Sequence, residues 1–491
     1  AMVKAVFDEL ASPSPKRQFT VGIRDDVTQL SLDWDTSFRT DAAQKLQHAV
    51  FWGLGADGTV SANKNSIKII GETTELNAQG YFVYDSKKSG AVTVSHLRFG
   101  EAPIRSTYLI EEGMAGFVAC HQTVFLERYD ILAHARPGGV FLLNTPELAE
   151  RVWDGLPEAI RAQIQAKGLQ LWIIDAYRVA ADAGMGRRIN TIMQTCYFAI
   201  SGILPRDEAI AAIKQAVEKT YGRKSKRLAE LNFKAIDMTL AHLHQVEVPA
   251  QVGEQKAIEW TSAGSGLGEM PDFVRDITLP MYYGRGDQLP VSTMPLDGTW
   301  PVGTARYEKR NIALEIPVWE PDLCTQCGKC VLVCPHSAIR ARAFAESEAK
   351  NAPATFKHVP AKSKEYPAGT HISYQVAPED CTGCGDCVEA CPIHDKSNVS
   401  RKAVNMAPIT HELRLAEREN FAFFLSLPEY DRGALKHTTI PGAALLDPLF
   451  EFSGACSGCG ETPYIRLATQ LFGDRMLVAN ATGCSSIYGG N

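Results

Sequence analysis

The sequence has no uninterrupted apolar stretch of the ~18 residues that a membrane-spanning helix requires. Its start, Ala1 to Lys4, also lacks the charged and then apolar segments of a signal peptide. Basic residues are slightly fewer than acidic ones: the sequence has 50 Lys and Arg and 56 Asp and Glu, which gives a net charge of -6. Without a basic stripe, neither nucleic acid nor an anionic membrane surface is an expected partner. We therefore expect a cytoplasmic protein.

Isolated cysteines are also scarce. Only Cys120, Cys196 and Cys484 of the 13 cysteines stand outside short clusters of the CxxC type. So many cysteines in a secreted chain would suggest disulfides, but close clustering is typical of metal ligation in a reducing compartment. With 45% apolar and 22% charged residues, the chain is otherwise an ordinary globular protein. Its length suits about three or four domains.

Residues 43 to 245 alternate between strand-like and helix-like segments. Short apolar runs predict strands over Ala49–Leu54, Gly80–Tyr84, Val92–Leu97, Gly116–Cys120, Gly139–Leu143 and Leu169–Ile174. Helical spacing of apolar residues predicts helices over Ile160–Lys167, Asp207–Lys219 and Lys224–His244. This alternation predicts an α/β layer fold with a mostly parallel sheet.

The segments around this α/β region differ from it in composition. Residues 1 to 42 have no clear core of their own and are expected to be the tail of a preceding domain. Residues 246 to 310 are rich in Gly and Pro and are predicted to form a linker. The cysteine-rich module follows over 311 to 425. Residues 426 to 491 begin a further unit with a predicted strand at Met476–Ala479 just before the last residue, so we expect a truncated domain there.

Two cysteine runs, beginning at Cys324 and Cys381, share the spacing C-x2-C-x2-C-x3-C-P. Bacterial ferredoxins wrap two [4Fe–4S] clusters with this spacing, and the fourth cysteine of each run ligates the other cluster. Zinc is the alternative, but zinc sites usually take two CxxC pairs, whereas each run here holds four cysteines and ends in Cys-Pro. We predict cluster one on Cys324, Cys327, Cys330 and Cys391, and cluster two on Cys381, Cys384, Cys387 and Cys334.

A third group of cysteines is less complete. Cys456 and Cys459 form a CxxC pair, and Cys484 follows them. Their spacing fits either a redox dithiol with a separate core cysteine or three ligands of another cluster. In the second case the fourth ligand would have to lie beyond Asn491.

A glycine motif, Gly53-Leu-Gly55-Ala-Asp-Gly58, lies between a predicted strand and the helix-like segment Asn63–Ile70. Glycines at this spacing let backbone amides and a helix N-terminus approach a phosphate. A nicotinamide coenzyme would need an acidic residue about twenty positions on, and only Glu72 and Glu75 in turn-like sequence are near that distance. Lys88 follows the next strand and either neutralises phosphate or is a solvated surface charge.

The sequence resembles the pyruvate:ferredoxin oxidoreductase family, also called pyruvate synthase, and its pyruvate:flavodoxin relatives. The resemblance covers nearly the whole chain, and its segments occur in the family's order. They are residues 55–64, 84–90, 95–100, 308–313 and 452–463, together with both cysteine runs.

The resemblance implies a role for each segment. Residues 43–245 would be a coenzyme-A-binding α/β domain, 246–310 a linker domain, 311–425 an α+β ferredoxin domain with two [4Fe–4S] clusters, and 426–491 the start of an α/β thiamine-diphosphate domain. The implied coenzyme A ligands are Ala56, Asp57, Gly58, Thr59, Val60, Lys88, Asn190 and Asn232. Cys456, Cys459 and Cys484 would be ligands of a proximal cluster, and Glu461 would contact thiamine diphosphate.

The implied activity of the intact enzyme is oxidative decarboxylation of a 2-oxo acid, with pyruvate as the expected substrate. Thiamine diphosphate with Mg²⁺ would hold the acyl carbanion, the clusters would remove its electrons one at a time, and coenzyme A would take the acyl group. Ferredoxin or flavodoxin would accept the electrons, and the family implies a homodimer. The family's 2-oxo-acid-binding Thr and Arg, its activating Glu and its Mg²⁺ motif have no counterpart here. We therefore expect this segment alone to be inactive.

Two other functions remain open at this point. The chain could be a non-catalytic electron-transfer subunit with a ferredoxin module, or an iron–sulfur reductase linked to NAD(P) through the glycine motif. Residues 335 to 380 separate the two cysteine runs more widely than a minimal ferredoxin requires. We expect this insert to pack on neighbouring domains.

Overall fold

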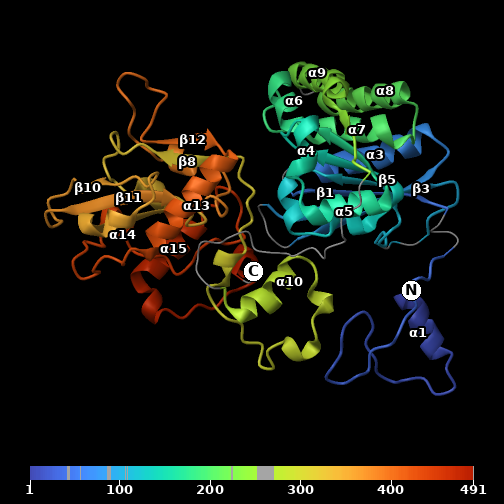
Figure 1. Ribbon diagram of the computed structural model, residues 1–491, viewed down its shortest axis with the longest axis horizontal. Coiled ribbons are helices and arrows are strands. Elements are labelled where there is room, and N and C mark those ends of the chain that lie inside the picture. The colour runs from blue at the N-terminus through green and yellow to red at the C-terminus, as the bar shows by residue number, and fades with distance from the viewer. Residues whose placement is uncertain are drawn as a thin grey trace. The chain divides into compact units, whose positions relative to one another are not determined.

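The computed structural model describes residues 1–40, 45–55, 57–85, 90–105, 107, 109–222, 225–250 and 270–489. The chain divides into two compact units (Figure 1). Most residues up to 250, with Tyr283–Met294, form the first unit, and most residues from 295 onward form the second. No helix in the described ranges is long and apolar enough to cross a membrane.

A seven-stranded sheet forms the centre of the first unit, in the order β2-β3-β1-β4-β5-β6-β7. The strands are β1 (Gln47–Leu54), β2 (Asn77–Tyr84), β3 (Val92–Gly100), β4 (Ala115–Cys120), β5 (Ala135–Asn144), β6 (Gln170–Ile174) and β7 (His244–Val246). All six predicted strands are therefore present, and β7 adds an edge strand that the sequence reading missed.

The prediction of a mostly parallel sheet is wrong. The pairs β1–β4, β4–β5 and β5–β6 are parallel, but β1–β3, β2–β3 and β6–β7 are antiparallel. Only the residues between Tyr84 and Val92 connect β2 to β3. That connection is too short for the crossover of a dozen or more residues that a parallel pair requires, so the two strands form a hairpin.

Helices cover both faces of this sheet (Figure 1). One face packs against α3 (Thr59–Thr73), α6 (Ala176–Ala183), α7 (Asn190–Ser201), α8 (Arg206–Val217) and α9 (Lys226–His242). The other packs against α4 (Ala149–Gly155) and α5 (Glu158–Lys167). Side chains in β1 alternate between the two cores, because Phe51 faces the first and Trp52 the second. Burial on both faces explains why the strands have near-continuous apolar sequences.

The helix predictions have a mixed outcome. Ile160–Lys167 lies inside α5, and Asp207–Lys219 contains most of α8. The third predicted helix extends too far, because α9 ends at His242 and His244 begins β7. The helix α7 was missed because its residues 191 to 198 are all buried, so it shows no apolar stripe with helical period.

The N-terminal segment belongs to the first unit. It begins with α1 (Met2–Leu10) and continues without regular structure. Its Asp26 carboxylate accepts hydrogen bonds from Ser292 N at 3.0 Å and Ser292 Oγ at 2.5 Å. Arg39 forms an ion pair with Glu111 at 2.8 Å. These contacts attach the predicted tail to other parts of the same unit.

The second unit contains two small antiparallel sheets, β10-β11-β9 and β12-β8. Their strands are β8 (Glu315–Trp319), β9 (Ile339–Ala345), β10 (Val359–Pro360), β11 (Thr370–Val376) and β12 (Val404–Pro408). Between β8 and β9 lies the first cysteine run with α11 (Lys329–Leu332), and between β11 and β12 the second run with α12 (Asp386–Glu389). The two cysteine runs thus occupy equivalent positions in two copies of a strand–helix–strand unit.

Each short helix follows a glycine with left-handed backbone. Gly328 has φ 71° and Gly385 has φ 84°. Glycine adopts this conformation without the steric cost that a Cβ brings. At Gly328 an added Cβ would also lie 2.8 Å from the Cβ of Ala444. Both positions therefore require the glycine that the sequence provides.

The other regular elements among the described residues of the second unit are helical turns and helices. Before β8 lie short turns that include α10 (Leu279–Tyr282). After β12 come α13 (His411–Ser426), α14 (Ile440–Ala443), α15 (Thr462–Phe472) and α16 (Cys484–Gly489). The predicted strand at Met476–Ala479 is wrong, because these residues have irregular backbone. Leu477 is fully exposed, and this apolar run pairs with no strand in the described part of the chain.

Candidate metal centres and coenzyme loop

The cysteines predicted for cluster two surround one pocket. Cys334, Cys381, Cys384 and Cys387 line a space of about 350 Å³ that includes solvent-open volume. Three of these cysteines come from the second run, and the fourth is the last cysteine of the first run. Backbone amides point at two of the sulfurs, because Ala338 N lies 3.3 Å from Cys334 Sγ and Gly383 N lies 3.4 Å from Cys381 Sγ.

The cysteines predicted for cluster one also converge. Burial raises the pKa of Cys330, and the nearby thiols of Cys387, Cys324, Cys327 and Cys391 raise it further. Three of those four neighbours are the predicted partners of Cys330. The fourth, Cys387, belongs to cluster two, so the two cysteine sets adjoin each other. Gln326 N lies 3.2 Å from Cys324 Sγ.

The two sets fit [4Fe–4S] clusters by their donors and surroundings. Each set offers four thiol groups, mostly buried among apolar side chains. Amide groups directed at the sulfurs are a recognised means of holding a cluster and tuning its potential. Burial raises the pKa of Cys387 to about 12, so a lone thiolate is disfavoured there. A bound cluster would supply the positive charge that stabilises thiolates at these positions.

The insert between the runs covers the first cysteine loop. Lys362 donates from Nζ to Cys324 O at 2.6 Å and from its backbone N to Gln326 Oε1 at 2.7 Å. Gln326 in turn donates to Pro360 O at 2.9 Å. Thr355 Oγ1 donates to Asn420 Oδ1 of α13 at 2.9 Å. Other residues of the insert, Arg340 and Arg342, pair with Glu451 and Asp447 of the segment 426–491, so the insert also packs on the segment that follows the predicted ferredoxin module.

The loop of Cys456 and Cys459 lies against the second cysteine run. Ser457 Oγ donates to Thr382 Oγ1 at 3.3 Å. A Cβ added at Gly458 would lie 3.4 Å from Asp386 Oδ2, which shows how close the two loops are. Cys456 and Cys484 are exposed, and Cys459 is partly exposed.

Glu461 and two of these thiols lie around one buried tyrosine. Burial raises the pKa of Tyr488, and Glu461, Cys459 and Cys484 raise it further. The structure thus brings Cys484 to the place where Cys459 and Glu461 lie, although Cys484 follows them by more than twenty positions in the sequence. Cys459 N also donates to Cys456 O at 3.1 Å.

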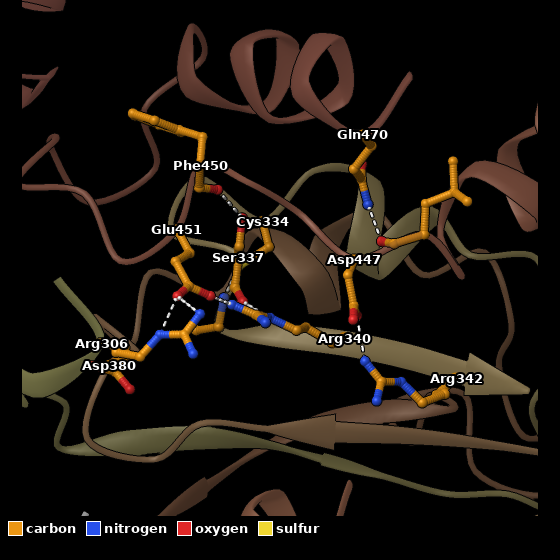
Figure 2. A network of polar contacts seen from close by, with 12 residues as sticks. Arg306, Cys334, Ser337, Arg340, Arg342, Asp380, Asp447, Phe450, Glu451 and Gln470 are labelled. Carbon is orange, nitrogen blue, oxygen red and sulfur yellow. Dashed lines mark hydrogen bonds and ion pairs between the residues drawn. The ribbon is translucent and has the colours of Figure 1, made fainter. Parts of the chain in front are cut away.

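A polar network holds the segment before this loop on strand β9 (Figure 2). Glu451 forms ion pairs with Arg306 and Arg340, and Ser337 Oγ donates to Phe450 O at 3.1 Å. Further along β9, Arg342 pairs with Asp447. Sequence reasoning missed this network because its members lie about a hundred positions apart. It fixes the Cys456 loop beside the cysteine runs.

The glycine loop in the first unit lies between β1 and α3, as predicted. Ala56 and Lys88 lie outside the described residues. The Asp57 carboxylate accepts hydrogen bonds from Leu54 N at 2.8 Å, Thr59 N at 2.8 Å and Thr59 Oγ1 at 2.5 Å. Burial alone would raise the pKa of Asp57, but interactions with His121 and Thr59 outweigh it and lower the pKa. Asp57 therefore holds the shape of the loop.

His121 is a residue of this loop site that sequence reasoning missed. Its Nδ1 lies 2.7 Å from Thr59 Oγ1, and its side chain is buried. Thr59 donates its proton to Asp57, so His121 donates from Nδ1 to Thr59 Oγ1. No hydrogen-bond partner of Nε2 is found among the described residues. The polar pair His121-Gln122, directly after a predicted strand, was the available signal.

Asn190 and Asn232 have different surroundings. Asn190 begins α7 and packs on the loop, because a Cβ at Gly58 would lie 2.9 Å from its Cβ. Asn232 is buried, accepts from Thr191 Oγ1 at 2.9 Å and donates to Leu228 O at 2.7 Å. Its amide is thus engaged within the helical layer, and its role toward coenzyme A stays a prediction. Val60, the next residue of the loop, is half-buried.

Three families of known proteins match parts of this chain. The family "Pyruvate ferredoxin/flavodoxin oxidoreductase" matches residues 48–241, a "4Fe-4S dicluster domain" matches 323–394, and a "Domain of unknown function" matches 265–313. The "Putative pyruvate-flavodoxin oxidoreductase" of Synechocystis is 56% identical over 491 residues, which is all of this chain and 40% of that protein. Over its whole length, the chain is similar to members of the pyruvate:ferredoxin oxidoreductase family.

Other members of this family match similarly. The "Pyruvate-flavodoxin oxidoreductase" of Nostoc is 56% identical over all of this chain and 41% of its own length, and the "Pyruvate:ferredoxin oxidoreductase" of Moorella thermoacetica is 48% identical over the same shares. The chain thus spans about two fifths of the length of these relatives. All eight cysteines of the two runs lie inside the matched 4Fe-4S dicluster domain.

Proposed function

We propose that this chain is part of an iron–sulfur, thiamine-diphosphate-dependent oxidoreductase that acts on pyruvate. The reaction would convert pyruvate, coenzyme A and oxidised ferredoxin or flavodoxin into acetyl-coenzyme A, carbon dioxide and reduced carrier. Residues 43–245 would bind coenzyme A, and residues 246–310 would form the linker domain that follows. Residues 311–425 would carry two clusters, and residues 426–491 would begin the thiamine-diphosphate domain. The names of the relatives support the substrate and the acceptor.

One observation carries this proposal. The loop of Cys456 and Cys459 lies directly on the second cysteine run, through Ser457 and Thr382. A third cluster held there, beside Glu461, would stand between the thiamine cofactor and the dicluster domain. Electrons removed from the substrate would then reach cluster two without crossing a long gap.

Turnover by the intact enzyme tests the third cluster. We expect Cys456→Ser to abolish pyruvate-dependent reduction of ferredoxin while the signals of clusters one and two remain in the electron paramagnetic resonance (EPR) spectrum. Ser457→Ala, which removes the hydroxyl that donates to Thr382 but keeps both thiols of the loop, is the matched control and should retain most activity. Full activity of the Cys456→Ser enzyme would contradict the proximal-cluster assignment.

Coenzyme binding is tested separately. We expect coenzyme A, but not NADH, to raise the melting temperature of the chain, because a ligand that binds only the folded state stabilises it. A shift with NADH and none with coenzyme A would contradict the assignment of the glycine loop and favour a nicotinamide-linked reductase. A cluster-loaded intact protein that never turns over a 2-oxo acid would favour the non-catalytic carrier.

A further inference from the structure

Arg466 is a buried cation that the functional assignments do not use. It lies in α15, and its side chain is almost completely buried, at 2% exposure. The guanidinium donates to the carbonyl oxygens of Val331, in a short contact, and of Leu332 at 2.6 Å. These carbonyls belong to α11 and lie between Cys330 and Cys334. Arg466 therefore reaches from the C-terminal segment to the chain that connects the two cysteine sets.

The charge of Arg466 has no carboxylate partner within the described ranges. Its Nε atom also has no hydrogen-bond partner there. Burial lowers the pKa of Arg466, the Cys334 thiol opposes this effect, and Arg340 adds to it. Arg340 is itself paired with Glu451. A buried guanidinium without a counter-ion is costly, so an anion is expected beside it.

A cluster held by Cys334 and its partners would supply that anion. Four thiolates around an iron–sulfur core give the site a net negative charge, and reduction adds one more negative charge. We propose that Arg466 is the counter-charge of cluster two and stabilises its reduced state. Reduction adds one electron, which dithionite supplies in a potentiometric titration, and no bond breaks. A fixed cation in a low-dielectric interior favours the state with more negative charge, so Arg466 raises the reduction potential of cluster two.

The alternative is that Arg466 serves only as a hydrogen-bonding cap for the carbonyls at the end of α11. The two roles differ in what they require. A cap requires the geometry of the guanidinium, whereas a counter-charge requires a cation. Lysine keeps the charge but not the planar fork, and glutamine keeps one amide donor but not the charge.

The test is a potentiometric titration of the reconstituted 491-residue chain, followed by EPR. We expect Arg466→Gln to lower the midpoint potential of cluster two by more than that of cluster one. Arg466→Lys should restore most of the wild-type value. The matched control is Arg432→Gln, because Arg432 also donates to a neighbouring carbonyl, Gln470 O at 2.7 Å, but is half exposed. The control should leave both potentials unchanged.

Three results would overturn the inference: unchanged potentials in Arg466→Gln, equal shifts in both clusters, or loss of cluster two in both Arg466→Gln and Arg466→Lys. Loss of cluster two in Arg466→Gln alone, with normal loading of Arg466→Lys, supports the counter-charge. The inference requires cluster two but not the proposed reaction on pyruvate. Iron content of the wild-type chain shows whether the clusters are present, independently of turnover.

Discussion

At the scale of single residues, Asp57 shows how the glycine loop is held. Its carboxylate accepts from two backbone amides and one hydroxyl, all on residues within three positions of Asp57. Hydrogen bonds to a carboxylate in a buried site are stronger than neutral ones. We expect Asp57→Asn to lower the free energy of unfolding by about 1–3 kcal/mol, measured by urea denaturation. Asp35→Asn is the matched control, because Asp35 accepts similar bonds from Ser37 on the surface. The control should change stability by less than about 0.5 kcal/mol.

The same residue predicts a pH dependence. The folded-state pKa of Asp57 lies below its ordinary value of 3.8, so the unfolded state binds the proton more readily. Stability from this group is therefore fully present above pH ~4 and is lost as pH falls through the lowered pKa. We expect the stability difference between wild type and Asp57→Asn to shrink in this acidic range, measured by urea midpoints. A constant difference down to pH ~2 would contradict this explanation.

At the scale of elements, the entry into α3 depends on a glycine. Gly58 has φ 84°, and an added Cβ would lie 2.9 Å from Asn190. We expect Gly58→Ala to distort the contact between the loop and α7 and to reduce the coenzyme A-dependent shift in melting temperature. Gly71→Ala in the same helix is the control, because no atom lies within 4 Å of its added Cβ. That change should stabilise the chain slightly, by up to about 1 kcal/mol, and leave the ligand shift intact.

The attachment of residues 446–453 to β9 is another property of elements (Figure 2). Arg340 and Arg306 pair with the same carboxylate, Glu451, but their side chains are 8% and 45% exposed. Removing Arg340 leaves Glu451 buried with only a half-exposed partner. We expect Arg340→Gln to destabilise the second unit by about 3–5 kcal/mol and Arg306→Gln by at most about 1 kcal/mol. Protection of β9 amides from hydrogen exchange should show the difference, and equal effects of both changes would contradict it.

Some elements could be predicted from sequence and others could not. The strands of the first unit were found because both of their faces are buried, which gives continuous apolar runs. The direction of β3 was not found, because apolar runs do not show whether a strand is parallel or antiparallel. The strand predicted at Met476–Ala479 was wrong for a related reason: an apolar run forms a strand only where a partner strand is available, and the run itself does not show whether one is.

At the scale of the whole molecule, the iron content counts the complete sites. We expect about 8 iron per chain for two [4Fe–4S] clusters, and about 12 when a third is closed by a further cysteine. Cys387→Ser should remove cluster two and leave about 4, whereas Cys120→Ala, at a buried cysteine outside both sets, should leave about 8. Anaerobic colorimetric iron assays decide this, and far less than 8 in the wild-type chain would contradict the dicluster assignment.

The sequence by itself determined the two cysteine sets, because cluster ligands follow one another at short, fixed spacing and the structure gathers the same eight residues. It also indicated the glycine loop between β1 and α3, since a strand–glycine–helix signal is local. Only the tertiary structure decided which polar groups surround these sites. Three hydrogen bonds show this. Arg466 contacts Val331, which is 135 positions away in the sequence. Arg340 contacts Glu451 at a separation of 111 positions, and Thr59 contacts His121 at a separation of 62 positions. Such partners are set by how distant elements pack, and no local pattern in the sequence records that packing.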